Sequence, residues 1–152
     1  MSSCRKDAER KEYIPLISLE SKTLPVNVNI HLLPTSKFKT TLVSVFLQQV
    51  LAKELAAQTA LLPAVLKRGT RQYPSFRDLK IRLEELYGAA LVADVIKKGE
   101  RQILSFSLEV INDKFTPGEK LLQQGLSILR DVIGDPLLEN GGFQKDYVQQ
   151  EK

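Results

Sequence analysis

The stretch AALVADVIKKGERQILSFSLEVI, residues 89–111, contains two runs in which apolar and polar side chains alternate. Alternation with a period of two places successive side chains on opposite faces of a strand. The residues KKGE between the two runs include a glycine, which suits the tight turn of a hairpin. In the second run, Leu104, Phe106, Leu108 and Val110 would share one face. The stretch therefore predicts an antiparallel hairpin with one apolar face.

Two further segments with strand character precede this hairpin. Residues 26–33, VNVNIHLL, alternate and predict a half-buried strand. The apolar residues on one face of this strand are Val26, Val28, Ile30 and Leu32. Residues 38–49, FKTTLVSVFLQQ, are rich in β-branched and aromatic residues and predict a strand buried on at least one side.

Two helical patterns lie between these strands and the hairpin. Residues 52–68 are rich in Ala, Leu, Lys and Glu, and Gly69 is a good helix stop. Pro63 either opens this helix or bends it, and the sequence leaves both alternatives open. Ser75 and Asp78 have the spacing of a capping box, which predicts the start of a second helix that ends at Gly88.

Two more helical patterns follow the hairpin. Thr116, followed by Pro117 and by Glu119 three residues after the threonine, predicts the start of a helix that ends at Gly134. Apolar residues between these ends recur with a helical period. Residues 143–152 predict a further helix, in which the sequence stops.

The order of these elements predicts an α+β fold, a two-layer sandwich of a mostly antiparallel sheet with helices packed on one face. Residues 1–13 are polar and charged and predict a disordered leader, so the predicted domain covers 14–152. The helical pattern at the end has no cap, which predicts that the sequence is a fragment of a longer chain.

The composition favours a protein that is not an enzyme. The chain has 22 Lys and Arg, 18 Asp and Glu, and a net charge of +4, which permits an acidic partner without requiring one. Its only histidine, His31, and its only cysteine, Cys4, limit metal and nucleophile chemistry. No apolar run is long enough for a membrane span, and no signal-peptide core is present, so we predict a cytoplasmic protein without a membrane partner.

The best local signal for binding is a basic cluster at residues 67–82. It consists of Lys67, Arg68, Arg71, Arg77, Lys80 and Arg82, with Tyr73 and Phe76 between them. Basic and aromatic side chains together suit phosphates and bases, so a stand-alone nucleic-acid-binding module is one hypothesis. The favoured interpretation is a helix end followed by the solvated face of an amphipathic helix.

Several segments resemble the insulinase-like (M16, inverzincin) metallopeptidases. In that family a helix carries H-x-x-E-H and is followed by a Gly-Thr pair. In TALLPAVLKRGT, residues 59–70, Gly69 and Thr70 match this pair, and Ala60, Pro63 and Ala64 stand where His, Glu and His would be. The other similar segments are PTSKFKTTLVSVF (34–46), RLEELYGA (82–89), KKGERQILSFSLEV (97–110) and FQKDYVQQEK (143–152).

The resemblance implies a non-catalytic bacterial subunit, of which this chain is part of the first domain. In active members two imidazoles hold Zn²⁺ and the glutamate activates the metal-bound water. Ala60, Pro63 and Ala64 supply none of these groups, so no catalytic residue and no metal are expected here. Glu151 resembles an acidic position that precedes the third zinc ligand, and the ligand itself is expected beyond Lys152.

The resemblance also implies an M16/LuxS-like metallohydrolase fold and a partner. Such chains pair with an active zinc-peptidase subunit, or with themselves, as two halves that enclose a peptide chamber, and zinc is expected only in the active partner. A non-catalytic half would supply chamber wall, interface and a sheet edge for peptide binding through main-chain hydrogen bonds. Nucleic acid is then not the expected partner. The candidates for binding peptide or anions are Lys67, Arg68, Arg71 and Arg77.

Overall fold

The computed structural model describes residues 19–151, and the leader predicted at 1–13 lies outside this range. The chain divides into two compact units, the first ending at Phe38 and the second beginning at Lys39. Each unit contains its own sheet, because no strand of one unit pairs with a described strand of the other.

The first unit is a two-stranded antiparallel hairpin. β1 (Glu20–Leu24) pairs with β2 (Val28–Leu32), and the 3-10 turn η1 (Pro25–Asn27) joins them. Between the strands, the hydroxyl of Ser21 lies 2.8 Å from Nδ1 of His31. The strand predicted at 26–33 is therefore present in shorter form, and the sequence pattern predicts only the second of these two strands.

The apolar side chains of β2 are not buried. Val28, Ile30 and Leu32 are 46%, 39% and 57% exposed. Within the first unit the half-burial predicted for this strand does not arise, because a two-stranded hairpin by itself is a single layer. Val26, which was expected on the same face of the strand, lies in η1.

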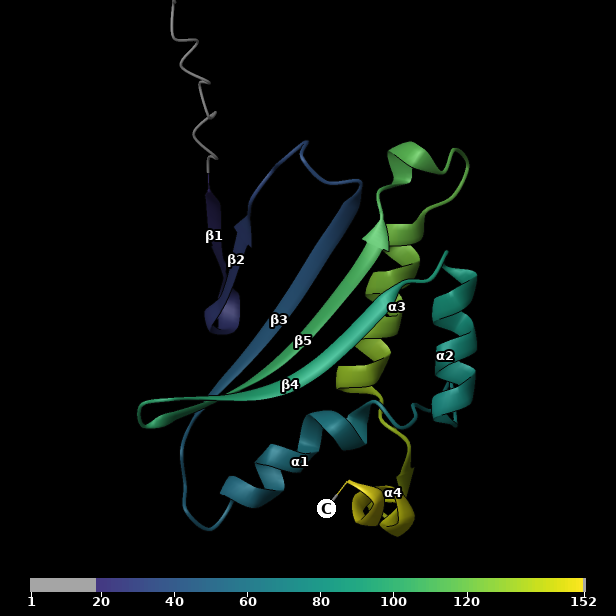
Figure 1. Ribbon diagram of the computed structural model, residues 1–152. Helices are drawn as coiled ribbons and strands as arrows, with labels where there is room; N and C mark the ends of the chain where they lie inside the picture. Colours follow the sequence, from purple (N-terminus) through teal and green to yellow (C-terminus); the bar gives the residue numbers. More distant parts are fainter. Residues whose placement is uncertain (1–18, 152) are drawn as a thin grey trace, which may run out of the picture. The chain divides into compact units, whose positions relative to one another are not determined.

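The second unit is built on a three-stranded antiparallel sheet (Figure 1). β5 (Arg101–Ile111) is the central strand, with β3 (Thr40–Val50) on one side and β4 (Ala90–Lys98) on the other. β4 and β5 are the predicted hairpin. Its turn contains Gly99 with a φ of +59°, a conformation that glycine adopts without steric cost.

Helices pack on one face of this sheet, as the sequence predicts. They are α1 (Ala56–Leu66), α2 (Phe76–Glu85), α3 (Leu121–Gly134) and the short α4 (Lys145–Gln150). α3 packs against β5, and α1 packs against β4 and β5 (Figure 1). A small hairpin of β6 (Leu138–Glu139) and β7 (Gly142–Phe143), which the sequence analysis does not predict, precedes α4. The α+β class is confirmed.

The core lies between β5 and the helices. The predicted apolar face of β5 is buried, and Phe106 and Leu108 are 0% exposed. The side chains that α3 adds to this core are Leu121, Ile128, Leu129 and Val132. Val43 and Val45 of β3 are half-buried at its margin, which confirms that β3 is buried on one side.

The opposite face of the sheet is left uncovered by the described helices of this unit. Leu42 and Phe46 of β3 and Val92 of β4 are 65%, 61% and 57% exposed. The strand register places Ser44 opposite Ser107 between these apolar side chains, and their hydroxyls are 2.8 Å apart. This face is therefore apolar at its sides and small and polar along its centre.

The predicted capping box of α2 is confirmed. The Ser75 hydroxyl accepts a hydrogen bond from the Asp78 backbone N–H, and the Asp78 carboxylate accepts one from the Ser75 backbone N–H, each at 3.2 Å. Two backbone donors that the first turn of a helix would leave free are thereby satisfied. α2 ends at Glu85, three residues before the predicted stop.

Replacing Ser75 with alanine is expected to lower the free energy of unfolding by about 1 kcal/mol, because the cap acceptor is lost. Ser127→Ala is the matched control, since this exposed serine bonds only to the carbonyl of Gln123 within the same helix. Denaturant unfolding followed by circular dichroism measures both variants. Equal effects of the two substitutions would contradict the importance of the cap.

The predicted start of α3 at Thr116 is wrong. The preceding segment instead forms the 3-10 turn η2 (Asp113–Phe115), and α3 begins at Leu121. Asn112 accepts a hydrogen bond from the N–H of Lys114, and Asp113 accepts one from the N–H of Leu122. The side chains of Asn112 and Asp113 thus accept hydrogen bonds from backbone N–H groups, which is the role that the sequence pattern assigned to Thr116 as the N-cap. The helix therefore starts later.

Gly125 allows α3 to lie close to β5. A Cβ at this position would be 2.7 Å from a methyl carbon of Leu108 and 3.0 Å from one of Val110. Both distances are shorter than a normal contact between carbon atoms. The glycine therefore sets the separation between helix and sheet at the centre of the core.

Gly125→Ala is expected to lower the free energy of unfolding by about 1–2 kcal/mol, because the added methyl group overpacks this contact. Gly134→Ala, at the end of the same helix, has open space around the new Cβ and should not destabilise the protein. Thermal or denaturant unfolding distinguishes the two variants. A Gly125→Ala protein as stable as Gly134→Ala would show that the helix can shift away without cost.

Candidate functional site

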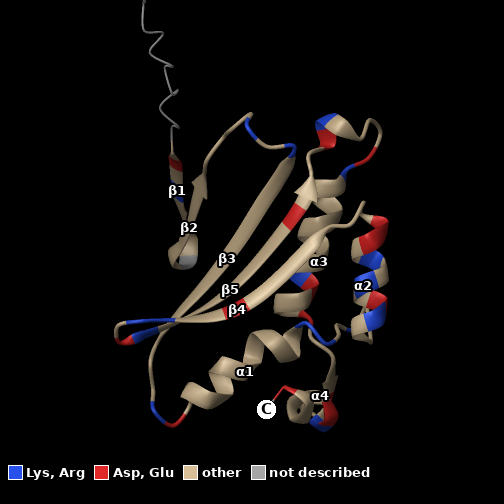
Figure 2. Cartoon of the chain, in the orientation of Figure 1, with Lys and Arg blue, Asp and Glu red and all other residues tan. Residues whose placement is uncertain are grey.

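The segment whose resemblance to H-x-x-E-H the sequence indicates lies in α1, and Pro63 is inside this helix rather than at its start. Of the two alternatives that the sequence leaves open, the one in which Pro63 opens the helix is therefore excluded. Pro63 has no N–H, so the carbonyl of Thr59 receives no hydrogen bond from it. Figure 2 shows that α1 carries no charged residue along its length.

The three positions of the degenerate motif differ in burial. Ala60 is exposed and Ala64 is half-buried, and their four-residue spacing places them on one face of the helix. Pro63 is among the fully buried side chains and packs in the interior. None of these side chains has an atom that binds a metal or accepts a proton. At these positions the helix contributes apolar atoms, and the buried one is Pro63.

Arg68 continues the face of Ala60 and Ala64 by one turn and links α1 to α4. Its Nε lies 2.5 Å from Oε1 of Glu151, and its Nη2 contacts the same oxygen. The side chains are 29% and 23% exposed, so the ion pair is partly shielded from water. The sequence analysis singles out both residues but does not predict that they meet, because 83 residues separate them.

A small hollow of about 190 Å³ lies at this ion pair. The residues that line it are Ala64, Lys67, Arg68, Phe76 and Glu151. The guanidinium carbon of Arg68 is 5.9 Å from the centre of the Phe76 ring, a distance at which a cation is attracted to the ring face. The hollow thus brings the end of α1, the start of α2 and α4 together.

The Gly-Thr pair after α1 has a structural role. A Cβ on Gly69 would lie 2.7 Å from the carbonyl oxygen of Pro74, so only glycine fits this close backbone approach. Thr70 is fully buried, and its hydroxyl accepts a hydrogen bond from the N–H of Tyr73 at 2.9 Å. The backbone N–H of Thr70 donates to the Tyr73 carbonyl at 2.8 Å. The pair therefore closes a tight loop between α1 and α2.

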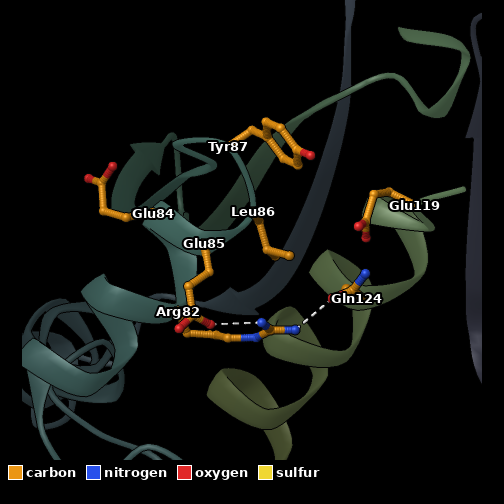
Figure 3. Close-up of a pocket in the computed structure, with 7 residues that line it drawn as sticks. All are labelled: Arg82, Glu84, Glu85, Leu86, Tyr87, Glu119 and Gln124. Atoms are coloured by element: carbon orange, nitrogen blue, oxygen red, sulfur yellow. Dashed lines mark hydrogen bonds and ion pairs between the residues drawn. The ribbon is translucent and has the colours of Figure 1, made fainter. Parts of the chain in front are cut away.

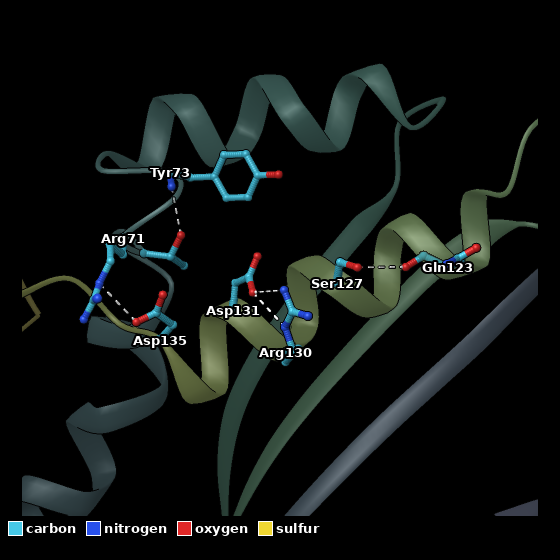
Figure 4. A network of polar contacts seen from close by, with 8 residues as sticks. Arg71, Tyr73, Gln123, Ser127, Arg130, Asp131 and Asp135 are labelled. Atoms are coloured by element: carbon cyan, nitrogen blue, oxygen red, sulfur yellow. Dashed lines mark hydrogen bonds and ion pairs between the residues drawn. The ribbon is translucent and has the colours of Figure 1, made fainter.

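Polar side chains of α3 lie beside this loop (Figure 4). Arg71 contacts Asp135 at 3.3 Å, and Arg130 donates two hydrogen bonds to Oδ1 of Asp131. Asp131 is buried, and its Oδ2 has no hydrogen-bond partner in the described part of the chain. Sequence reasoning did not identify Asp131, since it appears there as one charged residue in an amphipathic helix.

The structure divides the basic cluster. Lys67 and Arg68 line the hollow at the end of α1, whereas Arg71 contacts Asp135 and Arg77 lies exposed on α2. Two other members of the cluster form ion pairs on α2: Lys80 with Glu84 and Arg82 with Glu85, both at 2.9 Å. Acidic residues therefore lie among the cations of α2, as Figure 2 shows.

A second hollow, of about 460 Å³, lies between the end of α2 and the start of α3 (Figure 3). The Arg82 guanidinium crosses it, donating to Glu85 at 2.9 Å and to Gln124 at 2.6 Å. The hydrogen bond to Glu85 raises the pKa of Arg82 above its ordinary value, although burial acts in the opposite direction. Arg82 thus remains a cation that joins the two helices.

No metal centre is formed by the residues that the structure describes, because no three His, Cys, Asp or Glu side chains gather there with suitable spacing. His31 is exposed on β2 and contacts Ser21, as expected for a surface residue. Between residues 19 and 151, none of the helices has the length and apolar character needed to cross a bilayer.

The chain is similar in sequence to a bacterial protein whose name marks it as inactive. It is 40% identical over 134 residues to the "Probable inactive metalloprotease YmfF" of Bacillus subtilis (strain 168), a match that covers 88% of this chain and 32% of that protein. No family model matches the chain. The relative agrees with the metallopeptidase resemblance that the segments around Ala60, Pro63 and Ala64 indicate.

The fold is similar to the crystal structure of a conserved protein from Enterococcus faecalis V583. The TM-score is 0.82 at 30% sequence identity, over 88% of this chain and 31% of that one. The chain thus spans about a third of the length of each of these two proteins.

Proposed function

We propose that this chain, which belongs with the inactive M16-like metallopeptidases, forms part of a non-catalytic subunit that supports peptide processing by an active zinc-peptidase partner. The observation that carries the proposal is the set of residues that α1 has at positions 60, 63 and 64. The helix and its Gly-Thr loop are present, whereas Ala60, Pro63 and Ala64 supply neither the two imidazoles nor the carboxylate of H-x-x-E-H.

The free edge of β4 supports a role in peptide binding. β4 is an outer strand of the sheet, and α1 packs against it and β5, so its edge lies beside the degenerate motif (Figure 1). The N–H of Val95 bonds to Oδ1 of Asp94 at 2.7 Å instead of to β5. Because hydrogen-bonding directions alternate along a strand, Ala93 and Leu91 also direct their backbone groups to this edge. An extended peptide could pair with these groups.

The uncovered face of the sheet supports a role as chamber wall. Exposed apolar side chains such as Phe46 and Val92 flank the Ser44–Ser107 pair. Exposed apolar side chains gathered on one face of a sheet commonly mark a site of interaction with another molecule. In a two-subunit peptidase, this face would meet the substrate while the partner supplies the metal.

Native co-purification of the whole protein, with protein and nucleic acid in the eluate both analysed, tests the partner. We expect a homologue that retains H-x-x-E-H as the main co-purifying species. Recovery of nucleic acid without such a homologue would overturn the proposal in favour of the nucleic-acid-binding module at 67–82. Self-association of the protein without a homologue would also contradict an active partner.

Peptide binding to the β4 edge has a separate test. An extended peptide labelled with fluorescein is compared with the same sequence N-methylated at alternate residues, in both registers. Blocking the register that faces β4 should weaken binding about tenfold, since about two hydrogen bonds are lost. Equal binding of all three peptides would exclude strand addition as the mode of binding.

A further inference from the structure

The hollow beside the degenerate motif carries an excess of positive charge. Of the residues that line it, Lys67 and Arg68 are cationic and Glu151 is anionic. Arg68 is engaged with Glu151, whereas Lys67 forms no ion pair with any described residue. Lys67 is also half-buried at the end of α1, so part of its side chain packs against the protein beside the hollow.

The Arg68–Glu151 ion pair is arranged so that another carboxylate can share the arginine. Nε and Nη2 of Arg68 both contact Oε1 of Glu151, and the other guanidinium nitrogen, Nη1, makes no hydrogen bond to a described residue. A paired guanidinium usually presents two parallel donors to two oxygens. Nη1 of Arg68 and the Lys67 side chain, both at the hollow, are therefore the groups available to an incoming carboxylate while Glu151 stays in place.

The remaining walls of the hollow are small or apolar. Ala64 leaves space where a larger side chain of α1 would fill it, and the Phe76 ring is 49% exposed at the opposite wall. The methylene groups of a glutamate side chain match such walls, and its carboxylate matches the two cations. A hollow of about 190 Å³ accommodates one side chain of this size but not a nucleotide.

We propose that this hollow is a specificity pocket for an acidic side chain of the peptide substrate, with Lys67 and Arg68 as the carboxylate ligands and Glu151 as an internal competitor. The inference rests on the proposed function, because it names the class of peptide that the non-catalytic subunit selects. It also narrows the predicted set of Lys67, Arg68, Arg71 and Arg77 to the two residues that share one pocket.

Two labelled nonapeptides test the pocket, identical except for a central Glu in one and Gln in the other. Both carry a C-terminal amide, and a third peptide with Gln and a free C-terminus tests whether a terminal carboxylate is the true ligand. Fluorescence anisotropy with the whole protein measures the dissociation constants. The Glu peptide should bind about 3–10-fold more tightly than its Gln counterpart.

Three variants assign the preference to this pocket. Lys67→Gln should abolish most of it, and Glu151→Gln should increase affinity for the Glu peptide about 3–10-fold, since the competing charge is removed. Arg77→Gln is the matched control, because it removes a cation of the same basic cluster outside the pocket. Circular dichroism checks that each variant is folded.

The outcomes separate this inference from the proposed function. If Lys67→Gln and Arg77→Gln weaken binding equally, the effect is general charge attraction and the pocket is excluded. Unchanged or weaker binding by Glu151→Gln would also overturn it, as would a preference confined to the free C-terminus. Equal binding of the Glu and Gln amides, with the partner still co-purifying, would reject the pocket but keep the proposed function. No peptide binding and no partner would reject both.

Discussion

Phe106→Ala is expected to lower the free energy of unfolding by about 3–5 kcal/mol. Phe106 is 0% exposed at the centre of β5, where the register places it opposite Val45 on one side and Ala93 on the other. Truncation removes the largest fully buried side chain and leaves a cavity that these strands cannot close, since both are fixed by their pairing with β5. Denaturant unfolding and hydrogen exchange of the β5 amides measure the loss.

Phe46→Ala is the matched control for this substitution. Phe46 lies on the same sheet but on its uncovered face, and it is 61% exposed. Its removal should change the free energy of unfolding by less than about 1 kcal/mol, because little buried area is lost. If both variants lost similar stability, the uncovered face would be covered by another part of the protein, and the assignment of inside and outside would be wrong.

Gly69→Ala is expected to lower the free energy of unfolding by about 3 kcal/mol, which is more than the loss expected for Gly125→Ala. The new Cβ would lie 2.7 Å from the carbonyl oxygen and 3.0 Å from the carbonyl carbon of Pro74. These are backbone atoms held by the Thr70–Tyr73 hydrogen bonds, so they cannot rotate away as a methyl group of Leu108 can. The loop between α1 and α2 must then open.

The effect of Gly69→Ala is measured by denaturant unfolding and by hydrogen exchange at Thr70. Gly142→Ala serves as its control, because a Cβ at that position meets open space. A loss confined to the exchange rate of the loop, without a change in global stability, would show that the loop opens independently of the core.

Local patterns in the sequence predicted much of the second unit. The alternation in 89–111 predicted the hairpin of β4 and β5, and Ser75 and Asp78 predicted the start of α2. Both signals depend only on residues that are close in sequence. The false helix start at Thr116 has the same origin. Asn112 and Asp113 offered competing acceptors that the pattern did not weigh.

The candidate site was only partly predictable, because its contacts are long-range. The lack of a metal-binding or proton-accepting side chain at positions 60, 63 and 64 of α1 can be predicted from the sequence alone. The meeting of Arg68 with Glu151 has no sequence signal, and neither does the burial of Asp131, since both depend on how helices pack. For β2, alternation indicates which residues share a face, but not whether another layer covers that face.

The burial of Pro63 has a consequence for any variant in which H-x-x-E-H is built into α1. A glutamate restored at this position would have its carboxylate enclosed in the interior. Without both imidazoles and a metal to offset it, such a buried charge is strongly unfavourable. Glutamate at 63 alone is therefore expected to destabilise the protein, and histidine at 60 or at 64 alone would supply only one ligand.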